Sequence, residues 1–387
     1  MIFKYLKIKI DKPFIFLLVL SLFLLIALIL SAVNIESLKK INIDIAKKLL
    51  TTQKELQVFK NQDQYKINEN LKKDLKTTNK VFGQSLFSFE KIQDLKAQKI
   101  ITVKLDNLFA QILKQLSDLN YASAEANLKI LDSEIIKSTP VVSNAINEIN
   151  APVSNSPPTS GYNRQSVKTD NGNFAIDIIS ADLNSTRVIV DTTSDSTCSN
   201  DCPVKSLAEY VARSGAYAGI NGSFFCPAEY PSCVGKTNSF DLLVMNKNKV
   251  YFNSDNNVYS TNPAVIFGNG WVRFVSQSLE WGRDTGVDGV LSNFPLYVLG
   301  SKNVFGGSGD SKLTNKGSRN FVANKGNIIS IGIIYNASSE DAAKVLHALG
   351  MENALGLDQG GSTALWFNGY KAGPGRNIPN AILFVRK

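Results

Sequence analysis

The feature that most constrains this chain is an unbroken apolar segment near the N-terminus, residues 13–33, with the sequence PFIFLLVLSLFLLIALILSAV. A helix rises about 1.5 Å per residue, so a segment of this length spans the roughly 30 Å hydrocarbon core of a bilayer. We therefore expect a transmembrane helix at 13–33, preceded by a short N-terminal segment at 1–12.

The charges before this segment predict its orientation. Residues 1–12 contain four lysines and a single acid, Asp11. Lysine-rich flanks stay in the cytoplasm, which makes 1–12 cytoplasmic and sends everything after Val33 outside. A cleaved signal peptide is the alternative. We favour an uncleaved anchor, because the apolar run exceeds the usual core of about 7–15 residues and no clear cleavage site follows beyond Ser31-Ala32.

The cysteines agree with an extracytoplasmic location. Their C-x3-C and C-x6-C spacings are not those of zinc knuckles, and the single histidine, His347, is distant in sequence. Two disulfides are the better interpretation outside the cytosol. Three pairings are open for four cysteines, and we favour the two local ones. These join Cys198 to Cys202 and Cys226 to Cys233.

Composition excludes one class of partner. The chain has 387 residues and a net charge of +9, but no basic, aromatic-interleaved stripe concentrates that charge. We therefore expect no nucleic-acid binding. The length favours two or more domains.

Residues 34–137 predict helices, because this stretch contains no proline and only one glycine, Gly83. Aromatic and apolar residues around Gly83 predict a turn there, giving a helical hairpin or coiled-coil stalk. A spacer that lifts the rest of the chain off the membrane is favoured over a partner-binding module, and self-association through the stalk is a further hypothesis. Residues 138–165 are rich in Pro, Ser and Asn and predict a linker.

Residues 166–387 change to short β-type runs. Residues 174–179 and 187–191 predict a hairpin-like pair, and 206–214 predicts a helix. A second helix is expected at 338–349, with Ser338 as its N-cap and acids in its first turn. Many strands with few helices indicate an α+β domain built on a mixed, curved β-sheet.

A polar loop near the C-terminus, Gly356-Leu357-Asp358-Gln359-Gly360-Gly361-Ser362-Thr363, separates two apolar runs. Glycines allow close approach of the main chain to a ligand, and their N–H groups can hold an oxyanion beside an acid. The alternative is a tight turn with Asp358 as a solvated first residue. Three other polar sequences also interrupt apolar runs at strand ends, where side chains can face a cleft.

Together these four sequences resemble the phosphodiester glycosidase family over about residues 162–387. The matching segments are Asn221-Gly222-Ser223-Phe224-Phe225, Arg319-Asn320-Phe321, Asp358-Gln359-Gly360-Gly361-Ser362-Thr363 and Arg376-Asn377-Ile378-Pro379-Asn380-Ala381. Ser223, Asn320 and Gln359 depart from the family pattern. The change at Asn320 removes a potential hydroxyl contact, which bears on substrate choice more than on reaction type.

The resemblance implies hydrolysis of a sugar-1-phosphodiester. Asp358 is then the nucleophile or general acid, and carboxylates carry the proton transfers because His347 falls on an expected helix surface. Arg319 and Arg376 suit phosphate binding, since a guanidinium matches two phosphate oxygens. The other expected substrate-binding residues are Asn221, Gly222, Gly360, Gly361, Ser362, Thr363 and Asn380, with Asn221 contacting a sugar hydroxyl or the Asp358 carboxylate.

The second carboxylate of a glycosidase is not fixed by any motif. The candidates are Asp241, Glu229, Asp284, Asp288 and Asp310, and Asp241 is favoured because it follows the cysteine-bounded loop.

We expect no cofactor and no metal. The sequence thus predicts a membrane-anchored extracytoplasmic hydrolase of glycosyl phosphodiesters, with cell-envelope glycans as substrates. The alternatives are a non-catalytic glycan-binding module and an enzyme acting on ordinary glycosidic bonds.

Overall fold

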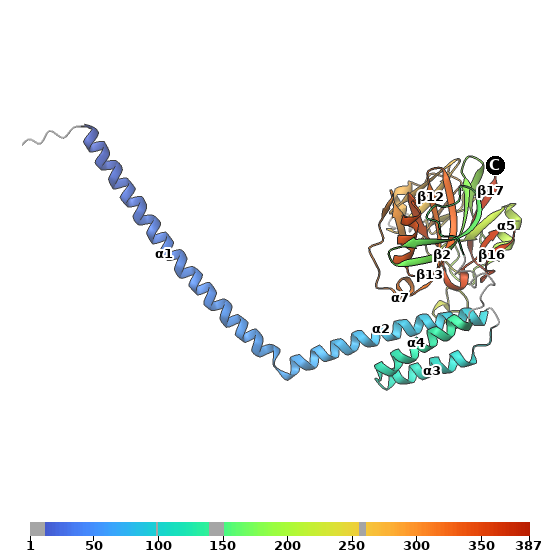
Figure 1. Ribbon diagram of the computed structural model, residues 1–387, viewed down its shortest axis with the longest axis horizontal. Coiled ribbons are helices and arrows are strands. Elements are labelled where there is room, and N and C mark those ends of the chain that lie inside the picture. Colours follow the sequence, from blue (N-terminus) through green and yellow to red (C-terminus); the bar gives the residue numbers. More distant parts are fainter. Residues whose placement is uncertain (1–11, 98–99, 139–150, 255–260) are drawn as a thin grey trace, which may run out of the picture. The chain divides into compact units, whose positions relative to one another are not determined.

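The computed structural model (Figure 1) describes residues 12–97, 100–138, 151–254 and 261–387. The chain divides into two compact units, Met1–Thr77 and Thr78–Lys387. Each unit is described separately.

The first unit is dominated by helix α1 (Lys12–Lys60), which contains the whole apolar segment. Within the part of the chain that the structure describes, this is the one helix that is long and apolar enough to cross a membrane. Helix α2 (Asp63–Ala97) begins in this unit and continues into the second. Residues 1–11 of the expected cytoplasmic segment lie outside the described residues.

In the second unit the end of α2 packs with helices α3 (Val103–Ser117) and α4 (Tyr121–Ser138). The predicted turn at Gly83 is wrong, because α2 runs through Gly83 without a break. A glycine costs a helix only about 1 kcal/mol relative to alanine. Burial of apolar residues on both sides of Gly83 outweighs that cost. The buried apolar residues of this bundle are Val81, Ile92, Leu95, Leu105, Ile112, Ala124, Leu128, Leu131 and Ile135.

The rest of the second unit is a β-rich domain of α+β class, as predicted. Its strands form three sheets whose paired strands run antiparallel in the described residues. The large sheet has the order β1-β2-β13-β12-β14-β10-β11. Its strands are β1 (Gly161–Thr169), β2 (Gly172–Asp182), β13 (Ile328–Ala337), β12 (Gly317–Lys325), β14 (Asn353–Gly356), β10 (Leu296–Leu299) and β11 (Lys302–Asn303).

Two smaller sheets complete the domain. The second sheet has the order β16-β15-β4-β17-β3, and the third has the order β6-β5-β9-β7-β8. The strands of the second sheet are β16 (Tyr370–Ala372), β15 (Leu365–Phe367), β4 (Ala218–Asn221), β17 (Asn380–Arg386) and β3 (Thr186–Thr192). Those of the third are β6 (Tyr251–Phe252), β5 (Val244–Met245), β9 (Gly289–Ser292), β7 (Ala264–Gly268) and β8 (Trp271–Val275).

One apolar core joins all three sheets. Val322 of the large sheet, Ile382 of the second and Val265 of the third belong to the same buried cluster. Helix α8 (Ser339–Ala348) packs on the large sheet, and helix α5 (Leu207–Ser214) packs on the second. Burial on both faces explains why these strands read as continuous apolar runs.

Both predicted helices of this domain are found, and each has a capping box. Ser338 accepts a hydrogen bond from the backbone N–H of Asp341, whose carboxylate accepts from Ser338 N in return. Ser206 and Glu209 make the same reciprocal pair at α5. Such caps satisfy N–H groups that have no partner within the helix.

The predicted hairpin between residues 174–179 and 187–191 is wrong. Strand β2 pairs with β1 and β13, whereas β3 pairs with β17 of another sheet. Strand β2 does form a local hairpin, but with β1, which precedes it, and β13 pairs with its other edge. The favoured disulfides are present, joining Cys198 to Cys202 and Cys226 to Cys233.

The β-rich domain begins before the expected boundary at residue 166. Residues 161–165 of the predicted linker lie in strand β1. Residues 139–150 of that linker lie outside the described residues.

Candidate active site

The site is built where strand ends of two sheets meet. Asn221 ends β4 of the second sheet, and Asp358 follows β14 of the large sheet. The backbone N–H of Asp358 donates to the carbonyl of Gly222 at 2.9 Å, which joins the two strand ends directly. Segments that are 137 residues apart in sequence thus come into contact, as the motifs predicted.

A buried network of side-chain amides holds the backbone of Asp358. Asn221 and Asn320 both donate to the Asp358 carbonyl, at 2.7 and 2.6 Å. Asn320 also donates to the Asn221 side-chain oxygen at 2.9 Å and to the Thr363 hydroxyl at 3.2 Å. Asn320 therefore replaces the hydroxyl of the family pattern with an amide that positions the loop.

Gly222 and Asn380 fit together in a way that requires glycine. A Cβ atom at Gly222 would lie 1.9 Å from the side-chain oxygen of Asn380. That oxygen accepts from the backbone N–H of Ser223 at 2.8 Å, and the Asn380 amide donates to the Ser223 hydroxyl at 3.0 Å. The first and last motifs are thus bonded to each other, and Ser223 takes part through its hydroxyl.

Asp358 is a buried acid whose proton affinity is strongly raised. The side chain accepts from the backbone N–H of Gln359 at 2.8 Å, and the residue is 8% exposed. Burial raises the pKa of Asp358 to about 7, although hydrogen bonds from Ser362 and Gln359 and the charge of Lys312 act in the opposite direction. An acid with a pKa near 7 can both give and accept a proton at neutral pH.

Three donors beside Asp358 converge on one position and form a cradle for an anion. They are the Arg376 guanidinium, the backbone N–H of Gly361 and the Tyr230 hydroxyl. The group in this position is the Asp94 carboxylate from helix α2, which accepts from Gly361 at 3.0 Å and from Tyr230 at 3.2 Å and is ion-paired with Arg376. We call these three donors the anion cradle.

The electrostatics of Arg376 suit an anionic partner. Its side chain is 5% exposed, and its Nε atom has no hydrogen-bond partner among the described residues. Burial lowers the pKa of Arg376 to about 10, and the charge of Glu90 opposes that shift. The guanidinium therefore stays charged at neutral pH, in surroundings where an anion is held strongly.

The other predicted arginine is anchored by protein groups. Arg319 donates to the Gln359 side chain at 2.7 Å and to the carbonyls of Leu313 and Asn315. Burial lowers the pKa of Arg319, and in the part of the chain that the structure describes its Nε atom has no hydrogen-bond partner. Arg319 lines the same cavity as Asp358 and Arg376, and its role in phosphate binding stays a prediction.

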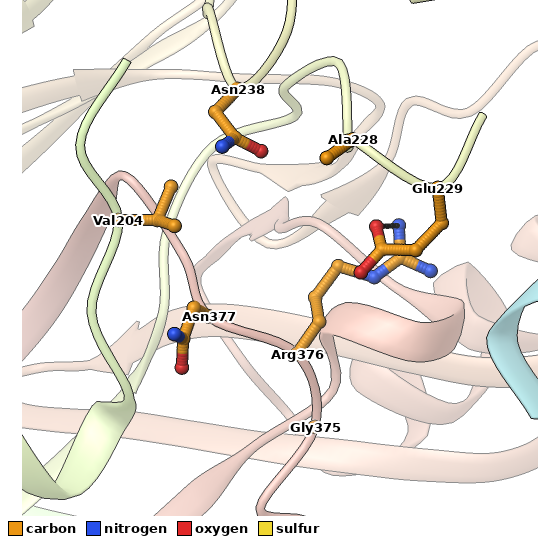
Figure 2. Close-up of a pocket in the computed structure, with 7 residues that line it drawn as sticks. All are labelled: Val204, Ala228, Glu229, Asn238, Gly375, Arg376 and Asn377. Atoms are coloured by element: carbon orange, nitrogen blue, oxygen red, sulfur yellow. Dashed lines mark ion pairs between the residues drawn. The ribbon is translucent and has the colours of Figure 1, made fainter. Parts of the chain in front are cut away.

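Two cavities adjoin Arg376. One, of about 130 Å³, is lined by Asp358, Arg319, Gly360, Ser362 and Arg376 on the β-rich domain. The other, of about 320 Å³, lies between the cysteine-bounded loop and the segment before β17, and Figure 2 shows Arg376 reaching towards Glu229 across it. The second cavity is lined by Val204, Ala228, Glu229, Asn238, Gly375, Arg376 and Asn377.

The candidates for a second carboxylate differ in position. Glu229 lies 3.9 Å from the Arg376 guanidinium. Asp241 is exposed and lines neither cavity, and its catalytic role stays a prediction. Within the described residues, no group of three His, Cys, Asp or Glu side chains is arranged to hold a metal ion.

Sequence reasoning missed the residues that α2 and the cysteine-bounded loop bring to the site. Asp94 and Tyr230 contact the cradle, and Glu90 pairs with Lys312 at 2.9 Å beside it. Asp94 and Glu90 lie in a segment that looks like an ordinary solvated helix. In the folded chain Asp94 is only 9% exposed and Glu90 only 8%. This burial identifies them as site residues, and it cannot be read from the sequence.

Residues 214–385 of this chain match the model of the phosphodiester glycosidase family. This confirms the resemblance predicted from the motifs, all four of which lie inside the matched range. No curated protein matches the sequence significantly.

Similar solved structures include a hypothetical protein from Synechocystis, at 14% identity and a TM-score of 0.40. That match covers 58% of this chain and 62% of the other. Another is the catalytic domain of zebrafish N-acetylglucosamine-1-phosphodiester alpha-N-acetylglucosaminidase, auto-inhibited by its pro-peptide. It is 13% identical, with a TM-score of 0.46, and the match covers 62% of this chain and 87% of that one.

The pKa of Asp358 predicts a specific pH dependence of stability. The folded-state pKa of about 7 exceeds the unfolded value of about 4, so the native state binds the proton more tightly. The resulting stabilisation is complete below about pH 4 and is lost as the pH rises to 7. Relative to Asp358→Asn, the unfolding free energy of the wild type should fall by roughly 4 kcal/mol over this range. Denaturant titrations of both proteins at pH 4 to 8 test this, and a constant difference contradicts it.

Proposed function

We propose that the protein hydrolyses glycosyl phosphodiesters, breaking the bond between the anomeric carbon of a sugar and a phosphate oxygen. Water adds to the anomeric carbon, and the other product is a phosphate monoester that carries the remaining alcohol. The observation that carries this proposal is the anion cradle beside Asp358. A carboxylate of the chain itself already satisfies the three donors that a phosphate would use.

In the proposed reaction each residue of the site has a separate role. Arg376 and the Gly361 N–H hold the phosphate, because a guanidinium and a bare backbone amide both donate to anionic oxygens. Asp358, half protonated near pH 7, gives its proton to the leaving phosphate oxygen or, when ionised, stabilises positive charge on the sugar. Asn221 and Asn320 keep the Asp358 loop in place through its carbonyl.

A phosphodiester carries two substituents on phosphorus, and Arg376 lines both cavities. We assign the sugar to the cavity that contains Asp358 and the alcohol to the larger cavity. Asn238, Asn377 and Glu229 line the larger cavity and offer hydrogen bonds to hydroxyl groups. The carboxylate of Glu229 disfavours a second phosphate there, so a neutral polyhydroxyl alcohol fits best.

The proposed location is the outer face of a membrane. The apolar helix, the lysines before it and the two disulfides support an anchored chain with its N-terminus in the cytoplasm and the β-rich domain outside. Cell-envelope glycans are then the accessible substrates. Self-association through the helical segment stays a prediction.

Replacing the acid tests the reaction. Asp358→Asn should lower kcat on a glycosyl phosphodiester by about 10²–10⁴-fold, because the amide cannot exchange the proton. Asp195→Asn, the same change at an exposed aspartate that is not a catalytic candidate, should leave kcat unaltered. Release of sugar and of phosphate monoester is measured across a panel of sugars. If the wild type binds these compounds but turns none of them over, the glycan-binding alternative is supported instead.

Removing the carboxylate from the cradle tests the anion site. Asp94→Asn takes away the competing anion, so KM and the Kd for inorganic phosphate should both fall by about tenfold or more. This estimate follows from about 1.5–3 kcal/mol for a hydrogen bond to a charged group. We expect kcat to stay within about twofold of wild type, since Asp94 competes with substrate and takes no part in the chemistry.

The matched control is Glu90→Gln, which breaks the pair with Lys312 one helical turn earlier but leaves the cradle occupied. Equal effects of both changes would mean that loosening α2, rather than freeing the cradle, is responsible. A large loss of kcat in Asp94→Asn would instead assign Asp94 to catalysis. Calorimetric titration with phosphate and steady-state kinetics provide the two measurements.

A further inference from the structure

We infer that α1 forms a parallel two-stranded coiled coil with a second copy of the chain, just outside the apolar segment. The inference does not depend on the proposed reaction. It rests on residues 35–59 of α1, which follow a seven-residue repeat for more than three repeats.

The first and fourth positions of the repeat, a and d, form one stripe along the helix. Six of the eight side chains on this stripe are large and apolar, and each is between 50% and 59% exposed. The stripe consists of Ile35, Asn42, Leu49 and Leu56 at a, and Leu38, Ile45, Thr52 and Phe59 at d. An exposed apolar stripe on a long helix in water is favourably covered by a partner.

The side of the helix opposite the stripe is rich in lysine, as expected of a surface that faces solvent. The f position, farthest from the stripe, is lysine in all three repeats, at Lys40, Lys47 and Lys54. Apolar residues do occur off the stripe, as at Ile43 and Leu50 in the b position. The b row begins and ends with polar residues, Glu36 and Gln57, so it gives no continuous second stripe.

Two features specify a second copy in parallel orientation. Asn42 at an a position faces its own counterpart only when two identical helices run parallel and in register, and such an asparagine favours two strands. Glu55 at g then lies opposite Lys60 at e of the partner, an attractive pair. The apolar segment precedes the stripe on the same helix, so two chains anchored in one membrane have their helices parallel.

Single cysteines in the full-length chain, oxidised in membranes, test the register. Ile45→Cys and Thr52→Cys lie at d, and the matched controls Lys47→Cys and Lys54→Cys lie two residues further on at f. The native cysteines are paired in disulfides within the chain. A disulfide needs Cβ atoms about 4 Å apart, so the d variants should give about tenfold more covalent dimer than the f variants.

Equal cross-linking at d and f positions, or none at either, overturns the inference. A second measurement guards against an oxidation artefact. Leu49→Asp combined with Leu56→Asp should convert the dimer to a monomer by light scattering in detergent, whereas Lys47→Asp combined with Lys54→Asp should not. A wild type that is monomeric in detergent and does not cross-link in membranes rejects the coiled coil outright.

Discussion

The site depends on the bond between the ends of two strands that belong to different sheets. The N–H of Asp358 donates to the carbonyl of Gly222, and two buried asparagines hold the Asp358 carbonyl from the other side. Buried polar groups of this kind are costly unless every partner is present. The network therefore fixes the acid in one place, and the pKa of Asp358 follows from that fixed, buried position.

A second feature of the site is that its charged groups are buried. Asp358 and Arg376 are both largely removed from water, and each has its pKa shifted towards neutrality by that burial. A guanidinium in contact with water would hold an anion weakly, because solvent would screen its charge. The three-sheet core beneath the strand ends excludes that solvent. The same packed core is therefore needed for the stability of the domain and for the strength of anion binding in the cradle.

Helix α2 belongs both to the helical bundle and to the candidate site. Its buried face supplies the apolar contacts of the bundle, while Asp94 and Glu90 on the same helix form ion pairs with Arg376 and Lys312 of the β-rich domain. These two ion pairs join the C-terminal end of α2 to the candidate site.

The sequence by itself determined the long apolar helix, the helical stretch, the capped helices, the α+β class and the four motifs that meet at the site. Each is a local pattern, either of composition or of residues required at one backbone position, such as Gly222. The partners of β2 and β3, the continuity of α2 through Gly83 and the entry of Asp94 into the cradle were decided only by tertiary structure. These three features depend on which surfaces, distant in sequence, bury the most apolar area and form the most ion pairs. A short stretch of sequence does not contain that information.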